Sequence, residues 1–137
     1  MSLAKILVVD DEIEIVRAVS MRLEASGYEV IVAHDGLIAT QLAIRASPDL
    51  VIMDIGMPCG DGHIVAQRLL NNVETSSIPI IYLTARTAEV DRKRAAISHV
   101  AGYLTKPFKA GELLATVARA LDISKQRTDS GYRVHSV

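Results

Sequence analysis

The chain has 137 residues, which suits one domain that buries roughly 70% of the surface exposed by its unfolded form. Its residues are 50% hydrophobic and 23% charged with no Trp, which predicts a globular fold around an aliphatic core. A net charge of −1 without a basic block gives no reason to expect direct nucleic-acid binding, and a single cysteine, Cys59, excludes an internal disulfide framework.

The apolar segments show no membrane or export signal. No apolar run approaches the ~20 residues that span a bilayer, and the N-terminus lacks a signal-peptide pattern. We therefore expect a soluble, cytoplasmic protein without a membrane partner.

The first part of the chain alternates short apolar strands with helical patterns. The predicted elements are a strand at Lys5–Val9, a helix from Ile13 until Gly27 stops it, a strand at Glu29–Ala33 and a helix at Leu37–Arg45. The acidic residues Asp10, Asp11 and Glu12 lie between the first strand and the first helix, where the positive end of the helix dipole tolerates negative charge.

The central stretch begins with four continuous apolar residues, Leu50 to Met53, and ends in one carboxylate, Asp54. Such a run predicts a strand that is buried on both faces, as in a parallel sheet. A loop containing Gly and Pro follows, and a helix is predicted from Asp61 or Gly62 to about Asn71.

The last part of the chain predicts two more strand and helix pairs. They are a strand from Ile78 to Leu83 with Pro79 as its first residue, a helix at Ala88–Ser98, a strand at Gly102–Thr105 and a helix from Ala110 or Gly111 to about Leu121. The thin apolar face of the helix at 88–98 suits movement or docking, or simply a solvated surface helix. Residues 122–137 are polar and lack a helical stripe, so we expect a domain at 4–121 followed by a tail or linker.

Five strands alternating with five helices predict an α/β fold, a parallel sheet covered on both faces through right-handed crossovers. Ligands bind at the carboxyl edge of such sheets. The polar residues that follow the strands should converge there: Asp10, Asp11, Asp54, Thr84 and Lys106.

This set of side chains suits phosphoryl transfer. Three carboxylates in one small site repel each other, and a hard cation such as Mg²⁺ relieves the conflict. A hydroxyl from Thr84 and an ammonium from Lys106 suit phosphoryl oxygens, which leaves Asp54 as the nucleophile. Taken singly, each residue has an ordinary alternative role as a helix cap, a turn residue or an exposed cation.

At these residues the sequence resembles the receiver domains of two-component response regulators, over roughly Lys5 to Leu121. The motifs that carry the resemblance are Ile6-Leu7-Val8-Val9-Asp10-Asp11-Glu12, Asp54-Ile55-Gly56-Met57-Pro58 with Asp61-Gly62, Leu83-Thr84-Ala85 and Lys106-Pro107-Phe108. The resemblance implies a flavodoxin-like, doubly wound five-stranded sheet with strand order 2-1-3-4-5. It also implies a cis peptide bond between Lys106 and Pro107.

The resemblance also implies a role for each site residue. Asp11, Asp54 and the backbone carbonyl of Gly56 would bind Mg²⁺ directly, and Asp10 would act mainly through a metal-bound water. Lys106 and Thr84 would contact the phosphoryl oxygens. Tyr103 would be the switch aromatic that turns inward when Thr84 moves.

The implied function is that of a response regulator receiver domain. It would accept a phosphoryl group on Asp54 from a histidine kinase or phosphotransfer protein and catalyse its own Mg²⁺-dependent phosphorylation and dephosphorylation, without being a conventional enzyme. Its face at residues 88–121 would then signal to a downstream effector or a tethered output domain, and homodimerisation on phosphorylation is left open.

Three alternatives compete with this interpretation. The nearest is a receiver-like interaction module that is never phosphorylated, although such modules usually lack part of the site. A haloacid dehalogenase-type phosphatase needs an Asp-x-Asp after its first strand, whereas Asp10 and Asp11 are adjacent. A flavodoxin-like redox protein needs a hydroxyl-rich loop there instead of an acidic one.

Overall fold

The structure, a computed structural model, describes residues 4–55, 62–84 and 101–135, and the side chains of these residues except those of His63 and 123–135. The elements in chain order are β1 (Lys5–Val9), α1 (Ile13–Ala25), β2 (Glu29–Ala33), α2 (Gly36–Ala46), β3 (Leu50–Asp54), α3 (Gly62–Leu70), β4 (Ile80–Thr84), β5 (Gly102–Thr105) and α5 (Ala110–His135). The predicted helix at 88–98 lies outside the described residues.

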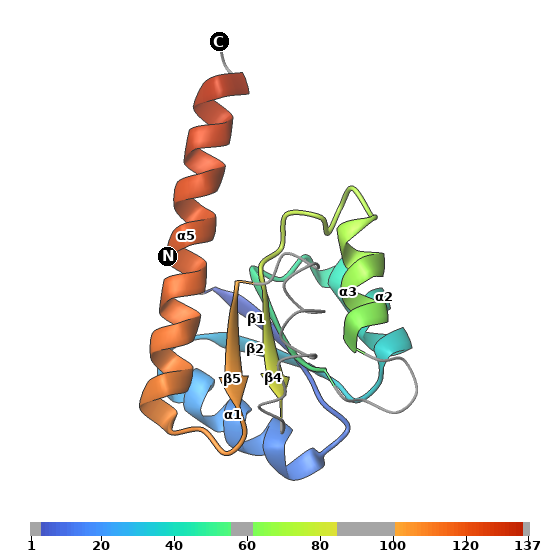
Figure 1. Cartoon of the computed structure of the whole chain (residues 1–137), viewed down its shortest axis with the longest axis vertical. Helices are drawn as coiled ribbons and strands as arrows, with labels where there is room; N and C mark the ends of the chain where they lie inside the picture. The colour runs from blue at the N-terminus through green and yellow to red at the C-terminus, as the bar shows by residue number, and fades with distance from the viewer. Residues whose placement is uncertain (1–3, 56–61, 85–100, 136–137) are drawn as a thin grey trace.

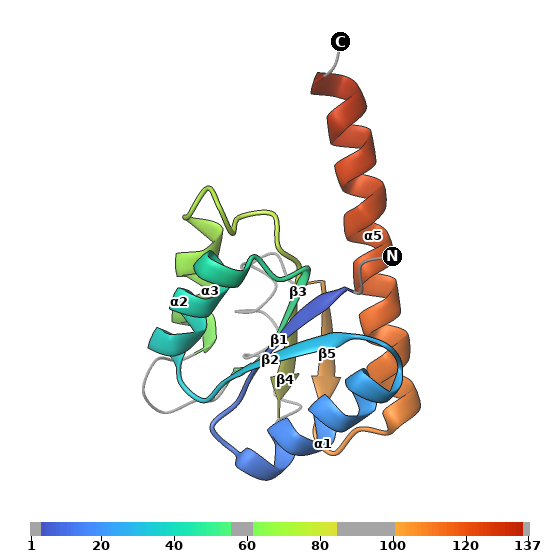
Figure 2. The same ribbon diagram turned by 180° about the vertical axis from the view of Figure 1, so that it is seen from behind.

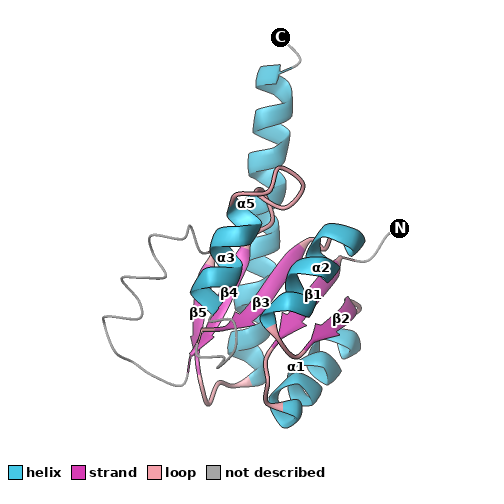
Figure 3. Ribbon diagram, turned by 90° about the vertical axis from the view of Figure 1, so that its right-hand side faces the viewer, coloured by secondary structure: helices cyan, strands magenta, loops and turns pink. Residues whose placement is uncertain are grey.

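The described strands form one five-stranded parallel sheet in the order β2-β1-β3-β4-β5, which confirms the predicted flavodoxin-like topology. Helices α2 and α3 cover one face of this sheet, and α1 and α5 cover the other (Figures 1 and 2). Figure 3 looks onto the face of the sheet, with α2 and α3 in front of the strands and α5 behind them. Because all strands run the same way, their carboxyl ends share one edge.

The period-two alternation of strand side chains divides the core between the two faces. In β1, Leu7 and Val9 pack into the cluster that contains the buried residues of α2 and α3. Ile6 and Val8 pack into the opposite cluster, with the buried residues of α1 and α5. Every residue of β3 is buried, as its continuous apolar run predicted.

The ends of the first two helices follow local chemistry. The Asp35 side chain caps α2 by accepting a hydrogen bond from the backbone N–H of Ile38 at 2.8 Å. After α1 ends at Ala25, Gly27 adopts a φ of +94°, a conformation that glycine adopts without strain. The predicted stop at Gly27 is confirmed.

The predicted start of the fourth strand was wrong by two residues. Strand β4 begins at Ile80, and Pro79 precedes it instead of serving as its first residue. Pro79 has no N–H to donate, but its carbonyl accepts a hydrogen bond from Val51 at 3.0 Å. Regular pairing of β4 with β3 therefore begins one residue later, at the pair of Val51 and Ile80.

The predicted end of the last helix was also wrong. Helix α5 continues to His135 instead of stopping near Leu121, and Figure 1 shows it running well past the end of the sheet. No glycine or proline follows Leu121 directly, and Lys125, Gln126 and Arg127 are good helix formers. The lack of an apolar stripe after Leu121 therefore did not mark the end of the helix.

No helix among the described residues combines the length and the apolar composition needed to cross a membrane.

Candidate functional site

Strand β3 delivers Asp54 to the carboxyl edge of the sheet. Asp54 is the last residue of the strand, and it is buried, with 7% of the residue exposed. The next residue, Ile55, donates its backbone N–H to Leu83 of β4 at 3.0 Å, so the two neighbouring strand ends are held together. The predicted nucleophile thus sits in the middle of this edge.

Asp10 comes to the same edge from the adjacent strand β1, and it is fully buried. Its backbone N–H donates to Ala33 at 3.2 Å, which places it beside the end of β2. Its carboxylate Oδ1 accepts a hydrogen bond from the backbone N–H of Glu12 at 2.9 Å. Nδ1 of His34, which is exposed, lies 3.2 Å from the Asp10 carbonyl oxygen, which can accept a hydrogen bond from it.

Lys106 follows directly after the edge strand β5, and its side chain reaches these carboxylates. Its backbone N–H donates to the carbonyl of Thr84 at 2.7 Å. Its ammonium donates to Asp10 Oδ2 at 2.9 Å and to Glu12 Oε1 at 3.1 Å. The same Nζ lies 3.6 Å from Asp54 Oδ2, and only 10% of the Lys106 side chain is exposed.

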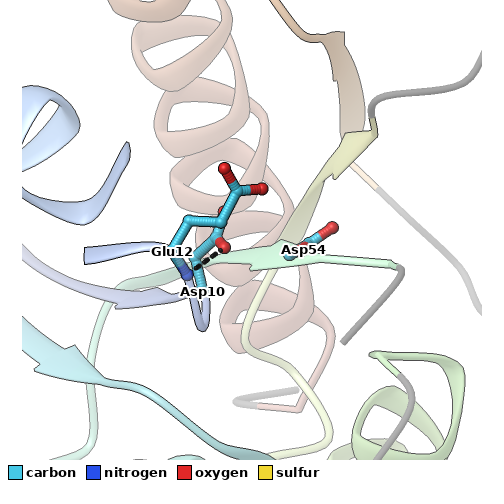
Figure 4. Close-up of side chains that lie close together, drawn as sticks. All are labelled: Asp10, Glu12 and Asp54. Atoms are coloured by element: carbon cyan, nitrogen blue, oxygen red, sulfur yellow. Dashed lines mark hydrogen bonds between the residues drawn. The ribbon is translucent and has the colours of Figure 1, made fainter. Parts of the chain in front are cut away.

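Three carboxylates gather around this ammonium. One oxygen from each of Asp10, Glu12 and Asp54 lies within 4.8 Å of the other two. Figure 4 shows Asp10 and Glu12 at the end of β1 with Asp54 across from them. The positive charge among these carboxylates is the Lys106 ammonium. Mg²⁺ prefers an all-oxygen donor set, so these residues also fit that ion.

The charges in this group alter two pKa values. Burial raises the pKa of Asp10 and the nearby charge of Asp54 adds to the rise, against the hydrogen bonds from the Glu12 N–H and Lys106. Burial by itself would lower the pKa of Lys106. The hydrogen bond to Asp10, the charge of Asp54 and the hydrogen bond to Glu12 outweigh burial and raise the Lys106 pKa above its usual value.

The structure brings together three of the predicted site residues, Asp10, Asp54 and Lys106. Thr84 ends the adjacent strand β4 and is buried. Asp11 is exposed and does not belong to the group of three carboxylates. Gly56 lies outside the described residues, so its expected carbonyl contact stays a prediction.

Tyr103, the predicted switch aromatic, lies in β5 and is partly buried. Its ring centroid lies 6.4 Å from that of Tyr82, a fully buried residue of β4, with the two rings tilted by 40°. The peptide bond between Lys106 and Pro107 is cis, as the resemblance implied.

Glu12 is the site residue that sequence reasoning missed. The sequence placed it in an acidic motif, but no role was assigned to it. Glu12 is the residue immediately before α1, and the chain bends at Asp11, between Glu12 and Asp10. Its contact with Lys106 joins residues 94 positions apart, so no local pattern of the sequence indicated its role.

Comparison with known proteins shows the family of this chain. Residues 6–118 match the response regulator receiver domain family. The chain is 40% identical over 125 residues to the DNA-binding dual master transcriptional regulator RpaA of Synechocystis, a match that covers 91% of this chain and 50% of RpaA. It is 36% identical over 137 residues to the response regulator PleD of Caulobacter vibrioides, covering 96% of this chain and 30% of PleD.

Solved structures show the same likeness. The chemotaxis response regulator CheY4 of Vibrio cholerae is 34% identical with a TM-score of 0.82, over 87% of this chain and 99% of CheY4. The receiver domain of the sensor histidine kinase PA1611 of Pseudomonas aeruginosa, which holds a magnesium ion in its active-site cleft, is 30% identical with a TM-score of 0.82, over 88% of this chain and 99% of that domain.

The chain spans half of RpaA and less than a third of PleD, so the match concerns one domain of each. The residues of this chain that match the family, 6–118, include Asp10, Glu12, Asp54 and Lys106. This chain belongs to the response regulator receiver domain family.

Proposed function

We propose that this chain accepts a phosphoryl group on Asp54 from a histidine kinase or a phosphotransfer protein. The observation that carries the proposal is the position of Lys106 Nζ, 3.6 Å from Asp54 Oδ2 at the carboxyl edge of the sheet. A buried carboxylate beside a fixed cation is a nucleophile next to a group that stabilises negative charge on the transferring phosphoryl group.

The proposed transfer needs one bond to form and one to break. An Asp54 carboxylate oxygen bonds to phosphorus while the bond from phosphorus to the donor breaks, and the leaving group departs with the electron pair. The Lys106 ammonium offsets the charge on the phosphoryl oxygens, and we propose that Thr84, at the end of the next strand, hydrogen-bonds one of them.

We further propose that Mg²⁺ is the resident cation and that the domain catalyses its own phosphorylation and dephosphorylation. Asp10 and Asp54 would hold the ion, with the predicted contributions of Asp11 and the Gly56 carbonyl. When bound, Mg²⁺ supplies positive charge that neutralises the phosphoryl oxygens. The group of carboxylates within 4.8 Å of one another supports this assignment.

The proposed output runs through Thr84 and Tyr103 to the surface that includes β5 and α5. The backbone N–H of Lys106 donates a hydrogen bond to the Thr84 carbonyl. A displacement of either residue would therefore move the start of the segment that leads into α5. We propose a receiver domain at 4–121 whose partner is an effector protein or a tethered output domain, joined through 122–137. A cytoplasmic location is supported by the single cysteine, Cys59, which fits a reducing compartment.

The test is incubation with acetyl phosphate, with Mg²⁺ or with a chelator, followed by intact-mass measurement of wild type and Asp54→Asn. We expect wild type to gain one phosphoryl group in the presence of Mg²⁺ and the variant to gain none. Acid quenching at several early times guards against rapid turnover. Wild type that gains no phosphoryl group at any time would favour the alternative, an interaction-only receiver module.

A further inference from the structure

Lys106 is held by one carboxylate more than phosphoryl transfer at Asp54 requires. Besides Asp10 and Asp54, its ammonium donates to Glu12 Oε1 at 3.1 Å. Glu12 belongs to no strand or helix and is the residue immediately before α1, from where its side chain reaches the ammonium that Asp10 also holds. This contact joins residues 94 positions apart in the chain, so only the folded protein makes it.

The three distances from Lys106 Nζ show where the ammonium is drawn. It lies closer to Asp10 and Glu12, at 2.9 and 3.1 Å, than to Asp54, at 3.6 Å. The Glu12 side chain is 58% exposed whereas that of Asp54 is 10% exposed. The ammonium is therefore held nearer to Glu12 than to the phosphoacceptor, although Glu12 is the more exposed of the two acids.

We propose that Glu12 is a positioning residue that competes with the phosphoryl group on Asp54 for the ammonium of Lys106. This inference rests on the proposed function of Asp54 as phosphoacceptor. Glu12 does not take part in bond making; it decides how freely Lys106 can turn to the incoming phosphoryl group.

Glu12 occupies one of the donors that Lys106 could offer to a phosphoryl group. An ammonium has three protons to donate, and Asp10 and Glu12 engage two of them, so the phosphoryl oxygens can receive more than one only if Glu12 releases its own. Asp10 is buried and anchored by the backbone N–H of Glu12, so its carboxylate cannot follow Lys106 outward. Glu12, exposed and on a long side chain, can follow the ammonium or release it.

The negative charge of Glu12 also affects an anionic phosphodonor and a metal cation, and it does so in opposite ways. A third carboxylate at the site repels an anionic donor but attracts Mg²⁺ to the group. Neutralising Glu12 should therefore raise the rate of phosphoryl uptake at saturating Mg²⁺ and weaken Mg²⁺ binding. Damage to the fold would instead lower both, so the opposite signs identify the role.

The experiment compares wild type, Glu12→Gln and Glu14→Gln. Glu14 is an exposed acid in the first turn of α1, so Glu14→Gln makes the same change in net charge two residues away from Glu12. Mg²⁺ affinity is measured by calorimetry without any donor. The initial rate of adduct formation with acetyl phosphate is measured by intact mass, with Mg²⁺ saturating for each variant.

For Glu12→Gln we expect the rate to rise about three- to tenfold and the Mg²⁺ dissociation constant to rise severalfold, the size of one nearby screened charge. Glu14→Gln should match wild type in both measurements. A Glu12→Gln rate equal to or below that of wild type would overturn the proposal. Wild type that forms no adduct would instead overturn the phosphoacceptor function on which the proposal rests.

A second pair of variants tests whether Glu12 acts through Lys106. Lys106→Met should react slowly, and adding Glu12→Gln to it should raise that slow rate much less than it raises the rate of wild type, because only the repulsion of the donor is left to remove. If Glu12→Gln accelerates Lys106→Met as much as it accelerates wild type, the effect comes from charge repulsion of the donor alone. That result would also overturn competition for Lys106.

Discussion

Two lysines lie at opposite ends of the sheet, and they are held by different kinds of partner. Lys5 starts β1 at the amino edge, where its backbone N–H donates to Asp49 Oδ2 at 2.7 Å and its ammonium donates to the carbonyl of Ala46 at 3.2 Å. Lys106 follows β5 at the carboxyl edge, and its ammonium contacts the carboxylates of Asp10, Glu12 and Asp54.

The difference separates a structural contact from an exchangeable one. The Ala46 carbonyl belongs to the last residue of α2, at the negative end of the helix dipole, and it cannot leave Lys5 without disturbing the helix. The partners of Lys106 are carboxylate side chains, which a metal cation can contact in place of the ammonium. The contacts of Lys5 at the amino edge are structural, whereas the charged side chains at the carboxyl edge can exchange their partners.

The largest expected effect compares Lys106→Met with Lys5→Met. Lys106→Met leaves buried Asp10 facing Asp54 without a counter-charge and should cost about 3 kcal/mol of unfolding free energy in metal-free buffer. Lys5→Met loses one side-chain hydrogen bond to a carbonyl and should cost about 1 kcal/mol or less. Urea unfolding with a chelator measures both, and equal losses would contradict the comparison.

Added Mg²⁺ sharpens the same comparison. A dication can take the place of the missing ammonium among the carboxylates, so it should restore part of the stability of Lys106→Met. It should do little for Lys5→Met beyond what it does for wild type.

A second, smaller effect concerns the backbone at the carboxyl edge. A Cβ added to Gly62, the first residue of α3, would lie 2.5 Å from the carbonyl oxygen of Asp54, so the start of α3 or the end of β3 must shift. Gly62→Ala should cost about 1–3 kcal/mol and slow phosphoryl uptake on Asp54.

Gly111→Ala in α5 is the matched control for Gly62→Ala. A Cβ at Gly111 would meet nothing within 4 Å, so this variant should gain about 0.5–1 kcal/mol from helix propensity. Thermal unfolding and adduct formation are measured on both variants. A Gly62→Ala protein as stable and as reactive as wild type would show that a Cβ at residue 62 is accommodated without cost, and would contradict the prediction.

The smallest effect is a change in how stability depends on pH. Burial raises the pKa of Asp10 above its unfolded value of 3.8, so the folded state binds the proton more tightly than the unfolded state does. The contribution of Asp10 to stability therefore falls as pH rises from 3.8 through the folded pKa, and the cost then stays constant.

Asp10→Asn removes this titration. Relative to wild type, the variant should become more stable as pH rises through that window, when both are unfolded by urea in chelator. A stability difference that stays constant across the window would contradict the raised pKa.

Much of the fold followed from the sequence because strand and helix patterns are local. The short apolar run at Lys5–Val9 predicted a strand, and the unbroken apolar run before Asp54 predicted a strand buried on both faces. Parallel strands then required their carboxyl ends to share an edge, which placed Asp10, Asp54 and Lys106 near one another before any distance was known. The end of α5 was missed because a helix can continue without an apolar stripe in its sequence.

The sequence alone thus determined the elements and the edge at which the charges meet, since both depend on the order and period of neighbouring residues. The tertiary structure alone decided which acids share the site, with Glu12 joining Asp10 and Asp54 while Asp11 stays exposed. It also brought Lys106 to within hydrogen-bonding distance of Asp10, 96 positions away in the chain. Distances between strand ends arise from how the sheet pairs and packs, and no local pattern encodes them.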